Sequence, residues 1–149
     1  MTMVEQGILL ADDDANDVFL VQRAFQKANL SNPLHVVPDG EEAVAYLAGT
    51  GSYEDRARHP LPGLVLLDLK MPRKSGFEVL EWVRRQPGLR RLVVVVFSSS
   101  NQQSDINRAY DLGVNSYLVK PADFDTLLEL VKCLSRYWLV LNEKPEVES

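Results

Sequence analysis

Residues 64–80 read LVLLDLKMPRKSGFEVL, which joins an apolar run, a short polar connection and an amphipathic segment. The unbroken apolar run over 64–67 is typical of a strand that is buried on both faces of a parallel sheet. The Ser-Gly pair at 75–76 is typical of a helix start, and apolar residues at helical spacing follow over 77–83. The stretch therefore predicts a strand followed directly by a helix, which is the repeating unit of α/β folds.

The same alternation of apolar runs and helical segments extends over the rest of the chain. Runs rich in Val, Ile and Leu recur at residues 8–11, 34–37, 92–97 and 116–119. Segments with helical spacing follow these runs at residues 18–28, 43–47, 106–110 and 124–138. Five strands that alternate with five helices imply right-handed crossovers, a parallel sheet and helices on both faces. We therefore predict a doubly wound α/β fold, with the flavodoxin-like strand order 2-1-3-4-5 as the working assumption.

Length and composition point to one domain. The chain has 149 residues, of which 46% are hydrophobic and 25% charged, values that are ordinary for one globular unit. We expect a single domain over 1–149, with a core at 7–141 and a polar, loose tail at 142–149. Residues 49–63 form a longer connection than most, so we expect a surface loop there.

Charge, hydropathy and cysteine content exclude several classes of function. The net charge of −5 argues against a nucleic-acid surface, because phosphate binding depends on clustered Lys and Arg. No apolar run approaches the roughly 20 residues of a membrane span and no leader pattern is present, so we expect a soluble, cytoplasmic protein. The single cysteine, Cys133, excludes an internal disulfide and a multi-thiolate zinc site. Its apolar neighbours favour a small packed side chain over a nucleophile.

Polar residues stand at the ends of four of the predicted strands. These residues are Asp12 and Asp13 after the first strand, Asp68 after the third, Ser98 after the fourth and Lys120 after the fifth. In an open α/β sheet the carboxyl ends of the strands hold the ligand, so we expect these side chains to lie together. Carboxylates in one place repel one another unless positive charge intervenes. Lys120 supplies one such charge, and a hard divalent cation such as Mg²⁺ would supply the rest.

This acidic pocket predicts phosphoryl chemistry on a carboxylate. Asp68 is the best candidate for the nucleophile, because it stands alone between an apolar strand and the loop that follows. Mg²⁺ and Lys120 would neutralise the phosphoryl oxygens, and Ser98 would hydrogen-bond to the acyl phosphate. Ser98 is the least specific member of the set, because Ser99 and Ser100 follow it and any of the three could cap the next helix.

A calcium-binding EF-hand loop is an alternative interpretation of the acidic segment. Such a loop beginning at Asp12 requires Gly at position 17 and Glu at position 23, where the chain has Asp17 and Arg23. The pattern therefore fails twice.

Helix capping is the simpler alternative for part of the same segment. Asp14, Asn16 and Asp17 fit the N-cap and first turn of a helix, where they would interact with the free amides and the positive helix end. Capping does not require two acids at a strand end, so Asp12 and Asp13 keep the functional interpretation.

The set Asp12-Asp13, Asp68, Ser98 and Lys120-Pro121 resembles the receiver domain of two-component response regulators. The resemblance covers residues 7 to about 141 and includes the segments LVLLDLKMPRKSGFEVL, VVVVFSSS and DLGVNSYLVKP. It implies a CheY-like fold and a sensor histidine kinase as partner. The long connection GTGSYEDRARHPLPGL and the ending YWL resemble single-domain regulators paired with bacterial phytochromes, which makes a phytochrome the candidate kinase.

By position, the resemblance assigns a role to each charged member of the pocket. Asp68 would accept a phosphoryl group from a phosphohistidine, and Lys120 would contact that group. Asp13, Asp68 and the backbone carbonyl of Lys70 would bind Mg²⁺, with Asp12 bound through water.

The resemblance also implies a conformational switch. Ser98 would be the switch hydroxyl, at a position where Thr is also common, and Tyr117 would be the aromatic residue that turns inward when the hydroxyl moves. The sequence shows no DNA-binding or catalytic output domain, so output would come from protein contacts. Enzymatic activity would be limited to the protein's own phosphorylation and dephosphorylation.

The last predicted helix carries two apolar rows. Its core row comprises Phe124, Leu127, Leu128, Val131, Leu134 and Trp138. Its second row, at spacings of three and four, comprises Leu130, Cys133, Tyr137 and Val140. A helix that is apolar on two faces usually buries both, and an exposed apolar patch commonly marks an interface. We predict a symmetric homodimer through this helix, with cover by the C-terminal tail as the alternative.

Three classes of function remain to be separated. The leading hypothesis is a phosphorylation-controlled signalling switch. An Asp-x-Asp phosphatase would need an acid where Lys70 stands, which argues against an enzyme that turns over substrate. A pseudo-receiver, which binds partners without being phosphorylated, stays open as the alternative.

Overall fold

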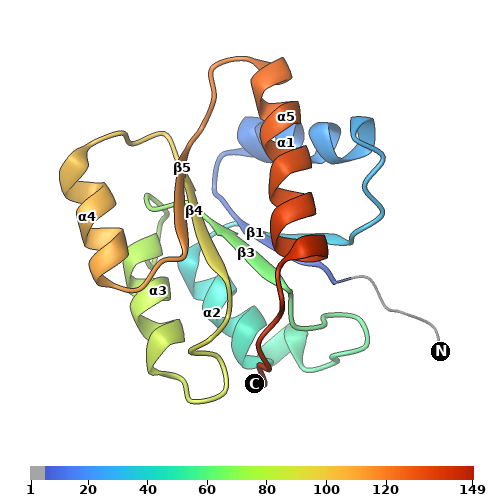
Figure 1. The fold of residues 1–149 in the computed structure, drawn as a ribbon. Coiled ribbons are helices and arrows are strands. Elements are labelled where there is room, and N and C mark those ends of the chain that lie inside the picture. Colours follow the sequence, from blue (N-terminus) through green and yellow to red (C-terminus); the bar gives the residue numbers. More distant parts are fainter. Residues whose placement is uncertain (1–5) are drawn as a thin grey trace.

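The computed structural model describes residues 6–149 and contains a parallel sheet with helices on both faces (Figure 1). The strands are β1 (Ile8–Ala11), β2 (Leu34–Val37), β3 (Leu64–Leu67), β4 (Val94–Ser98) and β5 (Ser116–Val119). The α-helices are α1 (Ala15–Lys27), α2 (Gly40–Ala48), α3 (Gly76–Arg85), α4 (Gln103–Asp111) and α5 (Phe124–Leu134). A short 3₁₀ helix, η1 (Gly51–Tyr53), follows α2, and a π-helix, η2 (Ser135–Leu141), continues α5.

The sheet has the strand order β2-β1-β3-β4-β5, with every pair parallel. The predicted α/β class and strand order are therefore confirmed. This order reverses direction between β1 and β3, so the carboxyl ends of these two central strands form the crevice in which doubly wound sheets bind ligands.

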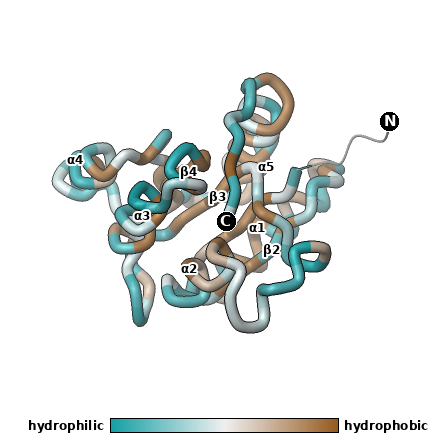
Figure 2. The backbone as a smooth tube through the Cα atoms, turned by 90° about the horizontal axis from the view of Figure 1, so that it is seen from below, coloured by the Kyte–Doolittle hydropathy of each residue, from teal (hydrophilic) through white to brown (hydrophobic). Residues whose placement is uncertain are grey.

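Two hydrophobic cores lie on opposite faces of the sheet, because successive side chains of a strand point to opposite sides. Leu9, Val65 and Val94 belong to the core under α2, α3 and α4. Ile8 and Leu64 belong to the core under α1 and α5. In Figure 2 the central strand segments carry the hydrophobic colour, whereas the loops are mostly hydrophilic. The cores leave the strand ends as the place where polar side chains can gather.

The edge strands differ from the prediction that all five runs are buried on both faces. In β2 and β5 most residues are half-buried or exposed, and Val36 and Val119 are 36% and 43% exposed. These strands lie at the two edges of the sheet, where helices cover the surface incompletely. The apolar content of residues 34–37 and 116–119 predicts burial on both faces, but the assumed strand order already places these two strands at the edges of the sheet.

The fourth strand begins and ends later than the apolar run over 92–97. Leu92 lies in the preceding turn, where its amide donates to the carbonyl of Leu89 and its carbonyl accepts from Arg84. Ser98 is the last residue of β4 rather than the first residue after it. The hydroxyl therefore lies on a rigid strand end.

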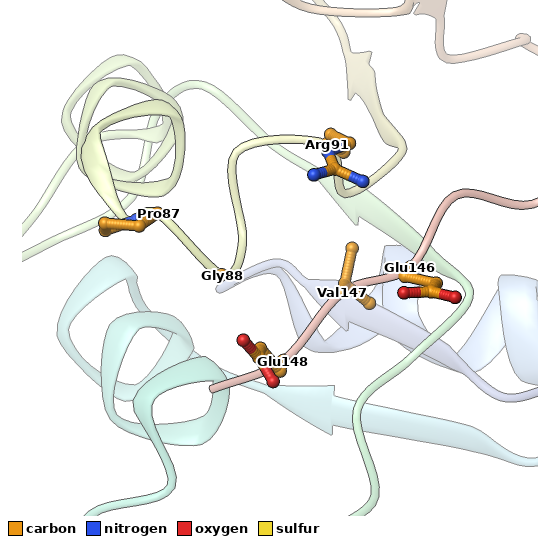
Figure 3. A pocket seen from close by; sticks show the side chains of 6 residues that line it. All are labelled: Pro87, Gly88, Arg91, Glu146, Val147 and Glu148. Carbon is orange, nitrogen blue, oxygen red and sulfur yellow. The ribbon is translucent and has the colours of Figure 1, made fainter.

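The C-terminal tail makes contacts that we did not expect of a loose segment (Figure 3). The amide of Glu148 donates to the carbonyl of Gly88 at 2.8 Å, and Val147 packs against the core under α2 and α3. A Cβ atom at Gly88 would come within 2.1 Å of the Glu148 carbonyl oxygen, so the glycine permits this close approach. The end of the tail thus lies over the loop after α3, whereas its beginning contacts η2, where the Lys144 ammonium donates to the carbonyl of Leu139. No helix within residues 6–149 is long and apolar enough to cross a membrane.

Candidate functional site

Carboxylates from the ends of β1 and β3 meet a lysine that follows β5. Lys120 Nζ lies 2.9 Å from Asp12 Oδ2 and 3.1 Å from Asp68 Oδ2. The Lys120 amide donates to the carbonyl of Ser98, which fixes the lysine backbone against the end of β4. The structure therefore brings together Asp12, Asp68, Ser98 and Lys120 as the sequence predicts, although 108 residues separate the first of them from the last.

Local backbone contacts orient the two buried carboxylates. Asp12 Oδ1 accepts a hydrogen bond from the Asp14 amide at 2.9 Å, and Asp68 Oδ1 accepts one from the Leu69 amide at 2.8 Å. A Cβ atom at Gly76 would lie 2.2 Å from the carbonyl oxygen of Asp68, so only glycine lets the start of α3 approach this strand end. In both carboxylates one oxygen is tied to the backbone and the other faces the pocket.

The buried oxygen of Asp12 is under-satisfied. Asp12 Oδ2 is within ion-pair distance of Lys120, but among the described residues it is the one buried side-chain polar atom without a hydrogen bond of acceptable direction. Burial raises the pKa of Asp12 above its ordinary value, against the opposing effects of the Asp14 amide and of Lys120. A further positive group at this oxygen would lower the electrostatic cost of the ionised carboxylate.

Lys120 is the positive centre of the pocket. Burial acts to lower its pKa, but the contacts with Asp17 and Asp12 and the charge of Asp68 outweigh burial and raise the pKa above the ordinary value of lysine. The Lys120 pKa rises because three carboxylates contact one ammonium, whereas the Asp12 pKa rises because burial outweighs the effect of Lys120. Lys120 is therefore charged at neutral pH, and the acids remain in excess.

The acids can hold a divalent cation. One oxygen from each of Asp12, Asp13 and Asp68 can be chosen so that the three atoms lie within 4.8 Å of one another. Oxygen ligands from carboxylates are what Mg²⁺, Mn²⁺ and Ca²⁺ prefer, and the under-satisfied Asp12 Oδ2 gives the cluster a reason to take one. The residues thus fit a hard divalent cation by position, oxygen chemistry and charge.

The predicted switch residues lie beside the pocket on β4 and β5. Ser98 is buried, and its hydroxyl oxygen accepts a hydrogen bond from the Ser100 amide at 3.1 Å. The hydroxyl of half-buried Tyr117 donates to the Ser100 carbonyl at 2.8 Å. Ser98 and Tyr117 therefore hold the same residue of the β4–α4 loop.

The three consecutive serines take different places. Ser100 supports the start of α4, since its hydroxyl accepts from the Gln102 amide and donates to Asp105. Ser99 is exposed. Ser98 is therefore the serine at the strand end, which resolves the ambiguity that the sequence leaves.

The acidic segment after β1 has both a capping role and a role in the pocket. Asp14 is the N-cap of α1 and accepts hydrogen bonds from the amides of Asn16 and Asp17, as the capping interpretation predicts. The Asp17 carboxylate instead contacts Lys120, with Asp17 Oδ2 2.7 Å from Nζ. The capping interpretation did not predict this contact, because an acid in the first turn of a helix is already explained by the helix end and suggests no distant partner.

The second apolar row of the last helix is largely exposed. Tyr137 and Val140 are 57% and 66% exposed, Cys133 is exposed and Leu130 is half-buried. The row borders a shallow groove that Leu118 of β5 also lines. The interpretation of Cys133 as a packed side chain is wrong, because position 133 faces away from the buried Val131 and belongs to the outward row.

Comparisons with known proteins agree with this geometry. Residues 8–132 match the family described as the response regulator receiver domain. The chain is 37% identical over 132 residues to the response regulator Rcp1 of Synechocystis sp., covering 89% of this chain and 88% of that protein. Its structure is similar to that of the phosphorylated cyanobacterial phytochrome response regulator RcpA, at 37% identity, a TM-score of 0.88 and coverage of 96% and 100%. It also resembles Mn²⁺-bound Rcp1, at 36% identity, a TM-score of 0.83 and coverage of 94% and 99%.

Proposed function

Since this chain belongs to the response regulator receiver domain family, we propose that it is a single-domain switch of a two-component phosphorelay, phosphorylated on Asp68 by a sensor histidine kinase. The observation that carries the proposal is the position of Asp68, with Lys120 Nζ 3.1 Å from one oxygen and Asp12 and Asp13 beside it. The proposed domain spans residues 1–149. The similarity to Rcp1 and RcpA favours a phytochrome as the kinase.

The proposed cofactor is Mg²⁺. Asp13, Asp68 and the backbone carbonyl of Lys70 would hold it directly, and Asp12 would hold it through water. The oxygen cluster and the Mn²⁺-bound form of similar Rcp1 support a divalent ion at this place. When bound, the cation would neutralise negative charge that gathers on the phosphoryl oxygens.

The chain's own residues prepare Asp68 as the phosphoryl acceptor. The Leu69 amide holds one oxygen of the carboxylate and Lys120 the other, so the group is oriented before the phosphoryl donor arrives. In the transfer, an Asp68 oxygen forms a bond to phosphorus while the P–N bond of the phosphohistidine breaks, and the electron pair of that bond stays on the imidazole. Lys120 then pairs with a phosphoryl oxygen. The protein would thereby promote only its own phosphorylation and dephosphorylation.

The proposed switch runs through the loop between β4 and α4. In the unphosphorylated structure the Ser98 hydroxyl accepts from the Ser100 amide, while Tyr117 donates to the Ser100 carbonyl. A phosphoryl group on Asp68 would offer Ser98 a stronger, charged acceptor. When Ser98 turns to that acceptor, the Ser100 amide loses its partner and the loop and Tyr117 favour a second arrangement. Phosphorylation would thus shift the populations of two conformations of this face.

Intact-mass measurement after incubation with Mg²⁺ and acetyl phosphate tests the proposal. We expect an adduct of one phosphoryl group per chain that is absent in Asp68→Asn and strongly reduced when Mg²⁺ is removed by EDTA. Asp111→Asn, a change of an exposed acid on α4, serves as the matched control and should keep the adduct. No adduct on the folded wild-type protein would favour the pseudo-receiver, and rapid multiple turnover of phosphodonor would favour a phosphatase.

We also propose a cytoplasmic homodimer that forms through the second row of the last helix. The support is the exposure of the Cys133, Tyr137 and Val140 side chains next to the groove with β5, while the end of the C-terminal tail lies over the loop after α3. Sedimentation of the wild type and of Tyr137→Glu, with and without phosphodonor, tests it. A dimer in the wild type that the substitution disrupts supports this interface, and a monomer under both conditions refutes it.

A further inference from the structure

Asp17 makes the shortest contact to the central lysine of the pocket. Its Oδ2 lies 2.7 Å from Lys120 Nζ, compared with 2.9 Å for Asp12 and 3.1 Å for Asp68. The Asp17 side chain is also more exposed than the other two, at 32% against 1% for Asp12 and 10% for Asp68. The ammonium is therefore held by acids from two kinds of element, the strand-end acids and an acid in the first turn of α1.

The position of Asp17 is fixed by the start of this helix. Asp14 caps α1 and accepts the Asp17 amide at 3.0 Å, so the Asp17 side chain begins from a rigid backbone. The Asp17 carboxylate is not needed to cap α1, because Asp14 already accepts hydrogen bonds from the amides of residues 16 and 17. The Asp17 carboxylate is thereby free to interact with Lys120.

Lys120 and a divalent cation compete for the same carboxylates. The lysine pairs with Asp12 and Asp68, and oxygens of these two residues with Asp13 form the cluster that fits a metal ion. An ammonium centred between Asp12 and Asp68 would neutralise both and weaken their attraction for a cation. A third partner on the far side would draw the ammonium away from them.

We propose that Asp17 is a positioning residue that holds the Lys120 ammonium toward α1 and so keeps Asp12 and Asp68 available to a divalent cation. The lysine stays in contact with Asp68, within reach of a phosphoryl group that arrives there. The inference rests on the proposed function, because it takes the acid cluster as a cation site.

The test measures cation binding to the unphosphorylated protein, without any phosphodonor. Mn²⁺ binding is followed by electron paramagnetic resonance and Mg²⁺ binding by titration calorimetry, for wild type, Asp17→Asn and Asp14→Asn. Both substitutions remove one negative charge from the same segment. Asn keeps the capping ability of position 14, and among the described residues Asp14 forms no ion pair with a Lys or Arg.

Asp17→Asn should weaken cation binding about tenfold, because the site loses a charge and also gains a competing ammonium. Asp14→Asn should weaken it by about threefold or less, through the charge alone. Equal losses in the two variants would overturn the positioning role. If the wild-type protein shows no saturable cation binding, the proposed cation site itself fails, which is a different result.

Removing the lysine separates the two effects of Asp17. In a Lys120→Met background there is no ammonium to reposition, so Asp17→Asn and Asp14→Asn should then weaken Mn²⁺ binding equally. A tenfold effect of Asp17→Asn that persists without Lys120 would show that Asp17 acts on the ion directly, which contradicts the proposal. Circular dichroism of each variant verifies that the fold is retained.

Discussion

The two ends of the sheet are formed by the same strands, but polar groups are paired at one end and crowded at the other. At the amino ends of β4 and β5, the Arg84 guanidinium donates to the carbonyls of Gly113, Arg90 and Leu92 and to Asn115 Oδ1. At the carboxyl ends of β1 and β3, three carboxylates share one ammonium and Asp12 Oδ2 lacks a hydrogen bond. Paired groups stabilise the first end, and crowded groups prepare the second for a ligand.

The amino end is also closed by segments from far along the chain. Asn115 directly precedes β5, and its Oδ1 accepts from the Val94 amide as well as from Arg84. This side chain therefore links the start of β5 to β4 and α3. The tail reaches the neighbouring loop through Glu148 and Gly88. Substitutions at this end should therefore affect stability, and substitutions at the carboxyl end should affect ligand binding.

The largest effect on stability is expected for Arg84→Ala. Burial lowers the pKa of the Arg84 guanidinium, but the group stays charged. Removing this side chain leaves the carbonyl oxygens of Gly113 and Leu92 without their donor. We expect the free energy of unfolding in urea to fall by about 2 kcal/mol. Arg85→Ala is the matched control: that exposed side chain pairs with Glu81 one turn away, and its loss should cost less than about 0.5 kcal/mol. Similar losses in both variants would contradict the role given to Arg84.

A smaller effect of opposite sign is expected for Asp13→Asn. The substitution removes one acid of the oxygen cluster formed by Asp12, Asp13 and Asp68, so the metal-free protein in EDTA should become more stable by about 0.5 kcal/mol. Mg²⁺ affinity, measured by calorimetry, should fall about tenfold or more. Asp55→Asn, in the loop before β3, removes the same charge and should change neither quantity. A destabilised metal-free Asp13→Asn protein would mean that the carboxyl end is not under electrostatic stress.

Much of the carboxyl end could be predicted because its residues directly follow apolar strands. Asp12, Asp68 and Lys120 each stand where an apolar run stops, and parallel strands bring their ends to one edge. Asp17 could not be found in this way. Its partner Lys120 lies 103 residues further along the chain, and a local capping pattern already accounted for an acid at this position.

The amino end could not be predicted from local patterns. Arg84 belongs to a helix whose last turn ordinarily carries basic residues, so nothing in the sequence distinguishes it from exposed Arg85. Val147 is a single apolar residue in a polar tail, which is too little pattern to predict packing. The apolar content of β2 and β5 alone predicts burial on both faces, and their exposure follows from their places at the edges of the sheet.

The smallest effect concerns His35 of β2, on the same side of the sheet as α2. Its ring packs 5.7 Å from that of Tyr46, burial lowers its pKa, and the nearby His59 lowers it further. As pH falls through about 6.5, the unfolded chain protonates this imidazole before the folded chain does, so stability should decrease toward pH 5. The loss should be less than about 0.5 kcal/mol, because the ring is only partly buried.

Comparison with His35→Phe isolates this contribution, because the other titrating groups, including His59, remain. Phenylalanine keeps an aromatic ring against Tyr46 but cannot take up a proton. The difference in the free energy of urea unfolding between pH 7.5 and pH 5.5 should therefore be smaller in the variant than in the wild type. An unchanged difference would place the pH sensitivity elsewhere.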